Sequence, residues 1–205
     1  NNPTGTAKTL QEIKDFLNNL PEDILVFLDQ AYFEYIEGTE FDIPFSLIDD
    51  YPNLVISRSF SKAHGLAALR LGFCISNPEL SDYLNRVRQP FNANSLALDL
   101  GKIALSDQEH IDKSVKINSS GMERVKTAFD SFNYSYIESW GNFISFDAKQ
   151  DSDVAFQYFL KKGVILRSLK VYEMPQHLRV SIGTEEEMDF FLKVLEEYEK
   201  DLSKK

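Results

Sequence analysis

Two clusters of polar side chains follow short apolar runs, and their chemistry suits a single ligand. Asp29 and Tyr32 come after the apolar run 24–28, and Lys62 comes shortly after the run 54–56. A lysine amine can bond an aldehyde covalently, and a carboxylate can keep a pyridine nitrogen protonated so that the ring draws electrons. Asp29 and Lys62 together therefore point to an aldehyde cofactor with a ring nitrogen.

Hydroxyl groups and a cation lie near Lys62 in the sequence. Ser59, Ser61 and Arg70 fall within the same segment. Hydroxyl donors and a guanidinium are groups that bind a phosphate well. Arg70 stands between two leucines, so we expect it to be buried and to need an anionic partner. The set predicts a site for pyridoxal 5'-phosphate.

The apolar runs that precede these clusters favour an α/β sheet. The runs 24–28, 54–56 and 71–75 lack polar alternation, which is typical of strands buried on both faces of a parallel sheet. Apolar residues at helical intervals predict a helix over about 9–20. Because ligands bind beyond the carboxyl ends of parallel strands, both polar clusters would open into one crevice.

After about residue 115 the pattern changes to alternating short strands and helices. Strands are predicted at 134–138, 142–146, 164–166 and 178–182, and helices at 154–161 and 185–202. The fold class is therefore α/β. Residues 1–114 would form part of a large domain with a mainly parallel sheet and flanking helices, and 115–205 a small α+β domain.

Three ordered motifs resemble those of the class I and II aminotransferases. They lie at 1–5 (Asn-Asn-Pro-Thr-Gly), 29–32 (Asp-Gln-Ala-Tyr) and 59–72, around Lys62. The resemblance covers the whole chain and implies the fold of a PLP-transferase large domain, with Lys62 as the catalytic residue. It also implies that Asn2 and Tyr32 hydrogen-bond the ring oxygen of the cofactor.

Further stretches resemble the histidinol-phosphate aminotransferases within that family. They are 89–97, with Pro-Phe-Asn-x-Asn, and 163–167 and 178–184, which contain a pair of arginines. By this resemblance Arg179 binds the anionic end of the substrate and Arg167 assists, since a guanidinium pairs with carboxylate or phosphate. The implied activity is transamination of L-histidinol phosphate with 2-oxoglutarate in histidine biosynthesis. The implied partners are small amino and keto acids, and the implied assembly is a homodimer.

Alternatives stay open at this point. In the family, a glycine-containing turn for the cofactor phosphate, a stacking aromatic and a tyrosine donated across the dimer precede the first motif. These 205 residues contain no counterpart, so an inactive fragment is one alternative. A threonine-phosphate decarboxylase-like enzyme and an aromatic or broad-specificity aminotransferase are others. His64 stands where Phe is common in the family, and we assign it no catalytic role.

Composition bears on partners and location. A net charge of -10 at pH 7 disfavours nucleic-acid binding through a basic face. No apolar stretch is long enough to cross a membrane, and no signal peptide is apparent. The single cysteine, Cys74, cannot form an intrachain disulfide and is expected in the core. We therefore expect a cytoplasmic protein with no nucleic-acid, membrane or metal partner.

Overall fold

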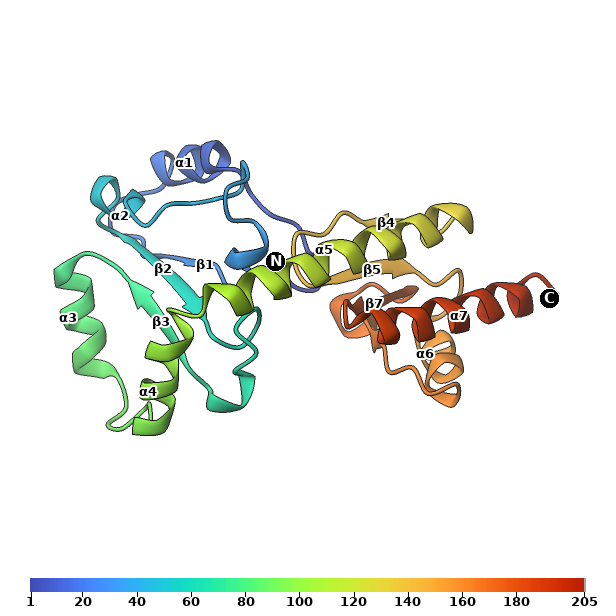
Figure 1. Ribbon diagram of the computed structural model, residues 1–205. Coiled ribbons are helices and arrows are strands. Elements are labelled where there is room, and N and C mark those ends of the chain that lie inside the picture. The colour runs from blue at the N-terminus through green and yellow to red at the C-terminus, as the bar shows by residue number, and fades with distance from the viewer. Residues whose placement is uncertain (205) are drawn as a thin grey trace. The chain divides into compact units, whose positions relative to one another are not determined.

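The computed structural model describes residues 1–204 (Figure 1). These residues form two compact units. The first unit is Lys8–Ser114, and the second combines Asn1–Ala7 with the chain from Val115 onward. The division predicted at 114/115 lies at the boundary between units, whereas residues 1–7 pack with the second unit. The domain ranges themselves stay a prediction, and residue 205 of the second range lies outside the described residues.

The first unit is built around a three-stranded sheet in the order β1-β2-β3. Its strands are β1 (Val26–Asp29), β2 (Leu54–Ser59) and β3 (Gly72–Ile75). Its α-helices are α1 (Leu10–Asn18), α2 (Leu47–Asp50), α3 (Pro78–Val87) and α4 (Ser95–Ala104), with the start of α5 (Gln108–Ser131). Short 3₁₀ helices lie at η1 (Phe33–Tyr35) and η2 (Ala67–Leu69). The predicted helix near 9–20 is α1, which opens with a capping box at Thr9.

The sheet of the first unit is mixed. β1 and β2 are parallel, as predicted, but β3 runs antiparallel to β2. The prediction of a mainly parallel sheet is therefore wrong for the described strands. A parallel return needs a long crossover, usually a helix, whereas the chain from β2 to β3 contains only the 3₁₀ helix η2. The N–H of Phe60 donates to the carbonyl of Leu71 at 3.2 Å, which closes this reversal.

Only the central strand of this sheet is buried on both faces. The run 54–56 is fully buried, as predicted, and Leu54 and Ile56 pack with α1 and α2. On the opposite face Phe27 of β1 is 58% exposed, and Cys74 of β3 is also exposed. The expectations of two-sided burial for the outer strands and of a core cysteine are thus wrong, because neighbouring residues of a strand face opposite sides.

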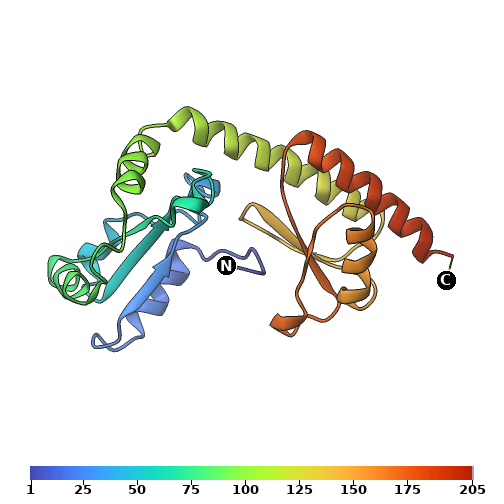
Figure 2. The same ribbon diagram turned by 90° about the horizontal axis from the view of Figure 1, so that it is seen from below.

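The second unit pairs an antiparallel sheet with three helices. Its strands, in the order β4-β5-β7-β6, are β4 (Tyr136–Ile137), β5 (Phe143–Asp147), β7 (His177–Ser181) and β6 (Arg167–Ser168). The helices are most of α5, with α6 (Ser152–Lys161) and α7 (Glu185–Leu202), and a 3₁₀ helix, η3 (Lys170–Tyr172), precedes β7. Figure 2 shows α5 and α7 running alongside each other.

Different segments pack on the two faces of this second sheet. Ile144 of β5 and Val180 of β7 are register partners, and both lie in the core with residues of α5, α6 and α7. The opposite face carries Ser145, whose hydroxyl donates to the carbonyl of Pro3 at 2.6 Å. The N-terminal turn is therefore attached to this face. Among residues 1–204, no helix combines the length and apolarity needed to span a bilayer.

A substitution at Gly5 tests the attachment of the N-terminal turn. Gly5 has a φ of +80°, and a Cβ there would lie 2.1 Å from the hydroxyl oxygen of Ser139. Gly163, the control, has a φ of +89° but would meet neighbours only at 3.7 Å. Gly163→Ala should cost about 1 kcal/mol through its left-handed backbone alone. Gly5→Ala should cost more and displace the turn.

Amide hydrogen exchange measures that displacement. The N–H of Trp140 donates to the carbonyl of Gly5 at 2.8 Å, so exchange at Trp140 should accelerate in Gly5→Ala and not in Gly163→Ala. Equal exchange in both variants would contradict the packing of Gly5 on Ser139.

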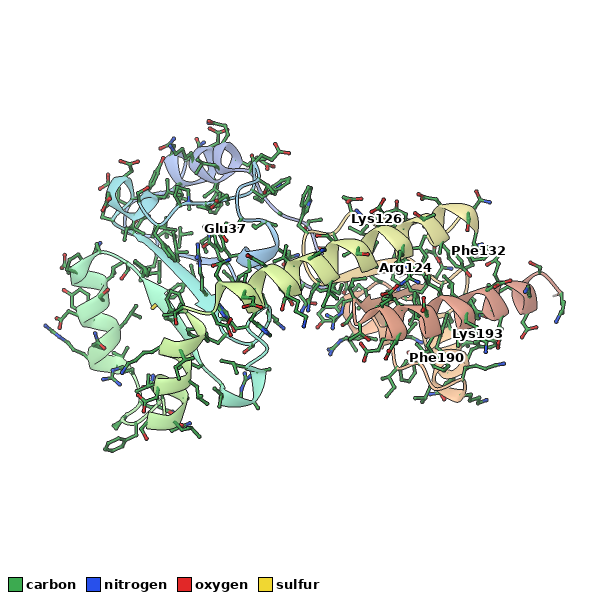
Figure 3. The ribbon with its side chains drawn as sticks, in the orientation of Figure 1. Glu37, Arg124, Lys126, Phe132, Phe190 and Lys193 are labelled. Atoms are coloured by element: carbon green, nitrogen blue, oxygen red, sulfur yellow. The ribbon has the colours of Figure 1, made fainter. Side chains whose placement is uncertain are left out.

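Two adjacent phenylalanines of α7 test where the core of the second unit lies. Phe191 is 2% exposed and Phe190, labelled in Figure 3, is 46% exposed. Phe191→Ala should lower the free energy of unfolding by about 3–5 kcal/mol through the cavity it leaves, and Phe190→Ala by about 1 kcal/mol or less. Urea unfolding followed by the fluorescence of Trp140 measures both. Similar losses would contradict this packing.

Candidate functional site

Two residues predicted to bind a cofactor end adjacent parallel strands. Asp29 is the last residue of β1 and Ser59 the last of β2. Asp29 is the register partner of Ser57, and Ser57 and Ser59 share a face because side chains alternate along a strand. Asp29 and Ser59 therefore project from the same face at the same end of the sheet. The carboxyl ends of parallel strands are where open α/β sheets bind ligands.

The amine of Lys62 lies beside the ring of Tyr32. Its Nζ is 5.2 Å from the centre of that ring, and both side chains are half-buried. Among residues 1–204, Nζ has no hydrogen bond or ion pair in the structure. The segments that follow β1 and β2 thus meet, and Lys62 offers an amine that no carboxylate occupies.

Local backbone contacts hold Asp29 and the two serines. The N–H of Ala31 donates to Oδ1 of Asp29 at 2.9 Å, which fixes the exposed carboxylate in a turn at the end of β1. The N–H of Ser61 donates to the hydroxyl oxygen of Ser59 at 3.0 Å. These contacts orient the oxygens of Asp29 and Ser59 at the strand ends.

Arg70 is exposed, so the expectation that it is buried is wrong. It follows η2 in the left-handed conformation, with a φ of 52°, and its guanidinium donates to the carbonyl of Ala67 at 2.8 Å. A left-handed residue at the end of a short helix turns the chain sharply, which brings Arg70 to the surface although a leucine stands on either side. Its proposed contact with a phosphate stays a prediction.

Arg58 is not among the predicted site residues, although this charged residue follows a buried apolar run. Its guanidinium carbon lies 3.3 Å from the centre of the Phe33 ring and 4.0 Å from that of Phe45. Its Nε donates to Oε1 of Gln30 at 3.1 Å. Burial lowers the pKa of Arg58, while the charge of Glu34 opposes that change. Arg58 thus lies among aromatic rings beneath the strand ends.

The second unit contains the other three predicted site residues. Arg179 donates through Nη1 to Oδ1 of Asn2 at 2.5 Å, and its guanidinium lies 4.8 Å from the centre of the Phe143 ring. Arg167 is exposed and donates to the hydroxyl of Tyr172 at 3.4 Å. The turn that carries Asn2 is therefore joined directly to one of the two arginines.

The two arginines are cross-strand partners. Arg167 of β6 is directly opposite Arg179 of β7 in the antiparallel register. Like charges in that position repel each other, so an anion between or beside them would relieve the repulsion. Carboxylates and phosphates fit the planar guanidinium group best. No group of three or more metal-binding side chains is found among the described residues.

Comparisons with known proteins identify the family of the chain. The family model described as "Aminotransferase class I and II" matches residues 1–195. Histidinol-phosphate aminotransferase 1 of Nitrosococcus oceani is 45% identical over 196 residues, which are 96% of this chain and 53% of that protein. Histidinol-phosphate aminotransferase 2 of Pseudomonas fluorescens strain Pf0-1 is 48% identical over 195 residues, or 95% of this chain and 53% of that protein. The chain thus spans about half the length of these curated relatives.

Solved structures share the fold of the whole chain. The histidinol-phosphate aminotransferase of Sinorhizobium meliloti in complex with pyridoxal-5'-phosphate gives a TM-score of 0.89 at 26% identity, covering 98% of this chain and 56% of that one. L-threonine-O-3-phosphate decarboxylase of Porphyromonas gingivalis gives 0.82 at 22% identity, covering 97% and 62%, a likeness of fold alone. Since the family match runs from residue 1 to residue 195, the chain belongs to the class I and II aminotransferases.

Proposed function

We propose that this chain is the C-terminal part of a pyridoxal-phosphate-dependent aminotransferase that transfers an amino group between L-histidinol phosphate and 2-oxoglutarate. One observation carries the proposal. The amine of Lys62, which has no ion-pair partner among residues 1–204, lies beside Tyr32, and Tyr32 follows the strand that ends in Asp29. The curated relatives that match 95–96% of the chain are named histidinol-phosphate aminotransferases.

The residues present fit the cofactor in their chemistry. Lys62 would bond its aldehyde, and Asp29 would hold its ring nitrogen protonated. Tyr32 and Asn2 would hydrogen-bond its ring oxygen, as the family resemblance implies. Ser59, Ser61 and the exposed guanidinium of Arg70 would bind its phosphate, which needs donors and a positive charge. When bound, pyridoxal phosphate supplies an electron sink.

Proton movement falls to Lys62. With the cofactor and the amino substrate bound, the amine of Lys62 would take a proton from the α-carbon of the substrate as general base and give it back as general acid. Asp29 would face the ring nitrogen of the bound cofactor and so support its action as an electron sink. The N–H of Ala31 donates to Oδ1 of Asp29 at 2.9 Å, which holds this carboxylate at the strand end.

Substrate binding falls to the paired arginines of the second unit. Arg179 would bind the phosphate of L-histidinol phosphate in one half-reaction and a carboxylate of 2-oxoglutarate in the other, with Arg167 assisting. The cross-strand position of the two like charges supports this role, because repulsion between them makes the pair receptive to an anion. We further propose that the protein acts in histidine biosynthesis as a homodimer in the cytoplasm.

Lys62→Ala tests the cofactor role. Adding pyridoxal phosphate to the chain should produce visible absorbance, and borohydride reduction should attach the cofactor to the peptide that contains Lys62. Lys62→Ala should abolish both results because it removes the amine that lies beside Tyr32. Lys102→Ala, which removes an exposed lysine of α4, is the control and should keep them. Attachment of the cofactor to another lysine in the wild-type chain would contradict the proposal. So would a wild-type chain to which no cofactor becomes attached.

Arg179→Gln tests the proposed role of Arg179 in substrate binding. The variant is made in the full-length protein that contains this chain. Loss of a charged hydrogen bond to the anion should lower kcat/KM for L-histidinol phosphate by about 10- to 100-fold. The control is Arg124→Gln on α5, labelled in Figure 3, which removes an arginine paired with Asp189. Steady-state assays of amino transfer to 2-oxoglutarate measure both. Release of carbon dioxide in place of amino transfer would contradict the reaction type.

A further inference from the structure

Glu34 and His64 face each other between the two segments that carry Tyr32 and Lys62. Nε2 of His64 lies 3.5 Å from Oε1 of Glu34, and the side chains are only 11% and 9% exposed, respectively. Glu34 comes two residues after Tyr32, and His64 comes two residues after Lys62. The contact therefore joins the segment beyond β1 to the segment beyond β2, directly behind the candidate cofactor residues.

The carboxyl of Glu34 is placed unusually for an acidic side chain. Its Oε2 is buried and has no hydrogen-bond partner among the described residues. A buried charge without a partner is costly, so a proton on or next to this carboxyl stabilises the folded chain. Burial raises the pKa of Glu34, and burial lowers the pKa of His64. Both directions favour a state in which the two groups hold one proton between them.

Charged neighbours surround this pair from several elements. Arg58 of β2 lowers the pKa of Glu34, and Glu37 raises it. His110 of α5 lowers the pKa of His64, and its Nε2 is 3.1 Å from the carbonyl oxygen of Ala63. Burial and the charge of Glu34 raise the pKa of Tyr35 to about 12, and the charge of Asp42 opposes the lowering of the pKa of Arg58 by burial.

We propose that Glu34 and His64 share one proton and act as positioning residues that hold the Tyr32 segment against the Lys62 segment. They touch neither the cofactor nor the substrate in this proposal, so they act through Lys62. Their importance for catalysis rests on the proposed function, but the contact itself does not. When His64 gains or loses its proton, the local environment of the Lys62 side chain should change with it.

The ring of His64 allows its packing to be separated from its proton. It packs against Phe60 in a tilted arrangement, with ring centres 5.0 Å apart. His64→Phe introduces the aromatic residue common at this position in the family, and it keeps an aromatic ring against Phe60. This variant cannot take up a proton, so it removes the titrating group while the fold is retained.

Carbon-13 NMR of the full chain tests the proposal. In the wild-type protein the Cε resonance of Lys62 should show a step at the pH where His64 titrates, and His64→Phe should remove that step. Glu34→Gln should lower the pKa of His64 by about 1 unit, because the imidazolium loses its carboxylate partner. The control is Glu40→Gln, which removes an exposed carboxylate from the same loop and should leave the pKa of His64 unchanged.

Each outcome supports or overturns the proposal. A wild-type Lys62 resonance without a step at the His64 transition overturns it, as does a step that survives in His64→Phe. An equal pKa of His64 in Glu34→Gln and Glu40→Gln also overturns it. Neither NMR readout uses pyridoxal phosphate. Failure of the cofactor to attach to Lys62 would therefore refute the proposed function alone, and a missing step would refute the positioning pair alone.

Discussion

Parallel pairing of β1 and β2 places the carboxyl ends of both strands, which carry chemically different side chains, at the same end of the sheet. The register pairs Asp29 with Ser57, so the carboxylate of one strand and the hydroxyls after the other start from the same edge and face. An antiparallel pairing of these strands would have sent Asp29 and Ser59 to opposite ends. Every proposed role in the first unit depends on this orientation, because the aldehyde and the ring nitrogen of one cofactor need both groups at once.

In the second unit, antiparallel pairing brings two like-charged residues opposite each other. It sets Arg167 directly across from Arg179, which places two positive charges side by side on one face of the sheet. The same face holds the N-terminal turn, through the hydroxyl of Ser145 and the amide of Asn2. A repulsive pair of this kind is costly without an anion. The proposed anion site and the contact with the N-terminal turn would therefore share one face of the sheet.

The residues behind the candidate cofactor site are as informative as those in it. Arg58 lies over two aromatic rings, and Glu34 and His64 are buried together. Ionisable groups in low-polarity surroundings hold or release protons according to small changes nearby. The surroundings of Lys62 are thus set by charged and aromatic side chains, and of Arg58, Glu34 and His64 only His64 lies within a recognised motif.

The sequence by itself determined the elements that depend on local patterns. The capping box at Thr9, the buried run 54–56 and the order of the three motifs could all be predicted because they depend on residue type and spacing. The strand end that carries Asp29 was also predictable, since apolar residues give way there to polar ones. The roles assigned to Lys62 and its neighbours came from motif and resemblance.

Only the tertiary structure decided which residues meet and which are covered. The reversal into β3, the exposure of Cys74 and the outward turn of Arg70 depend on connection length and on which face the remaining chain covers, and no local pattern encodes either. The contact between Glu34 and His64 joins residues 30 positions apart, so it exists only once β1 and β2 have paired. Burial and partners are properties of the packed chain, which is why sequence could propose the site but not the groups that support it.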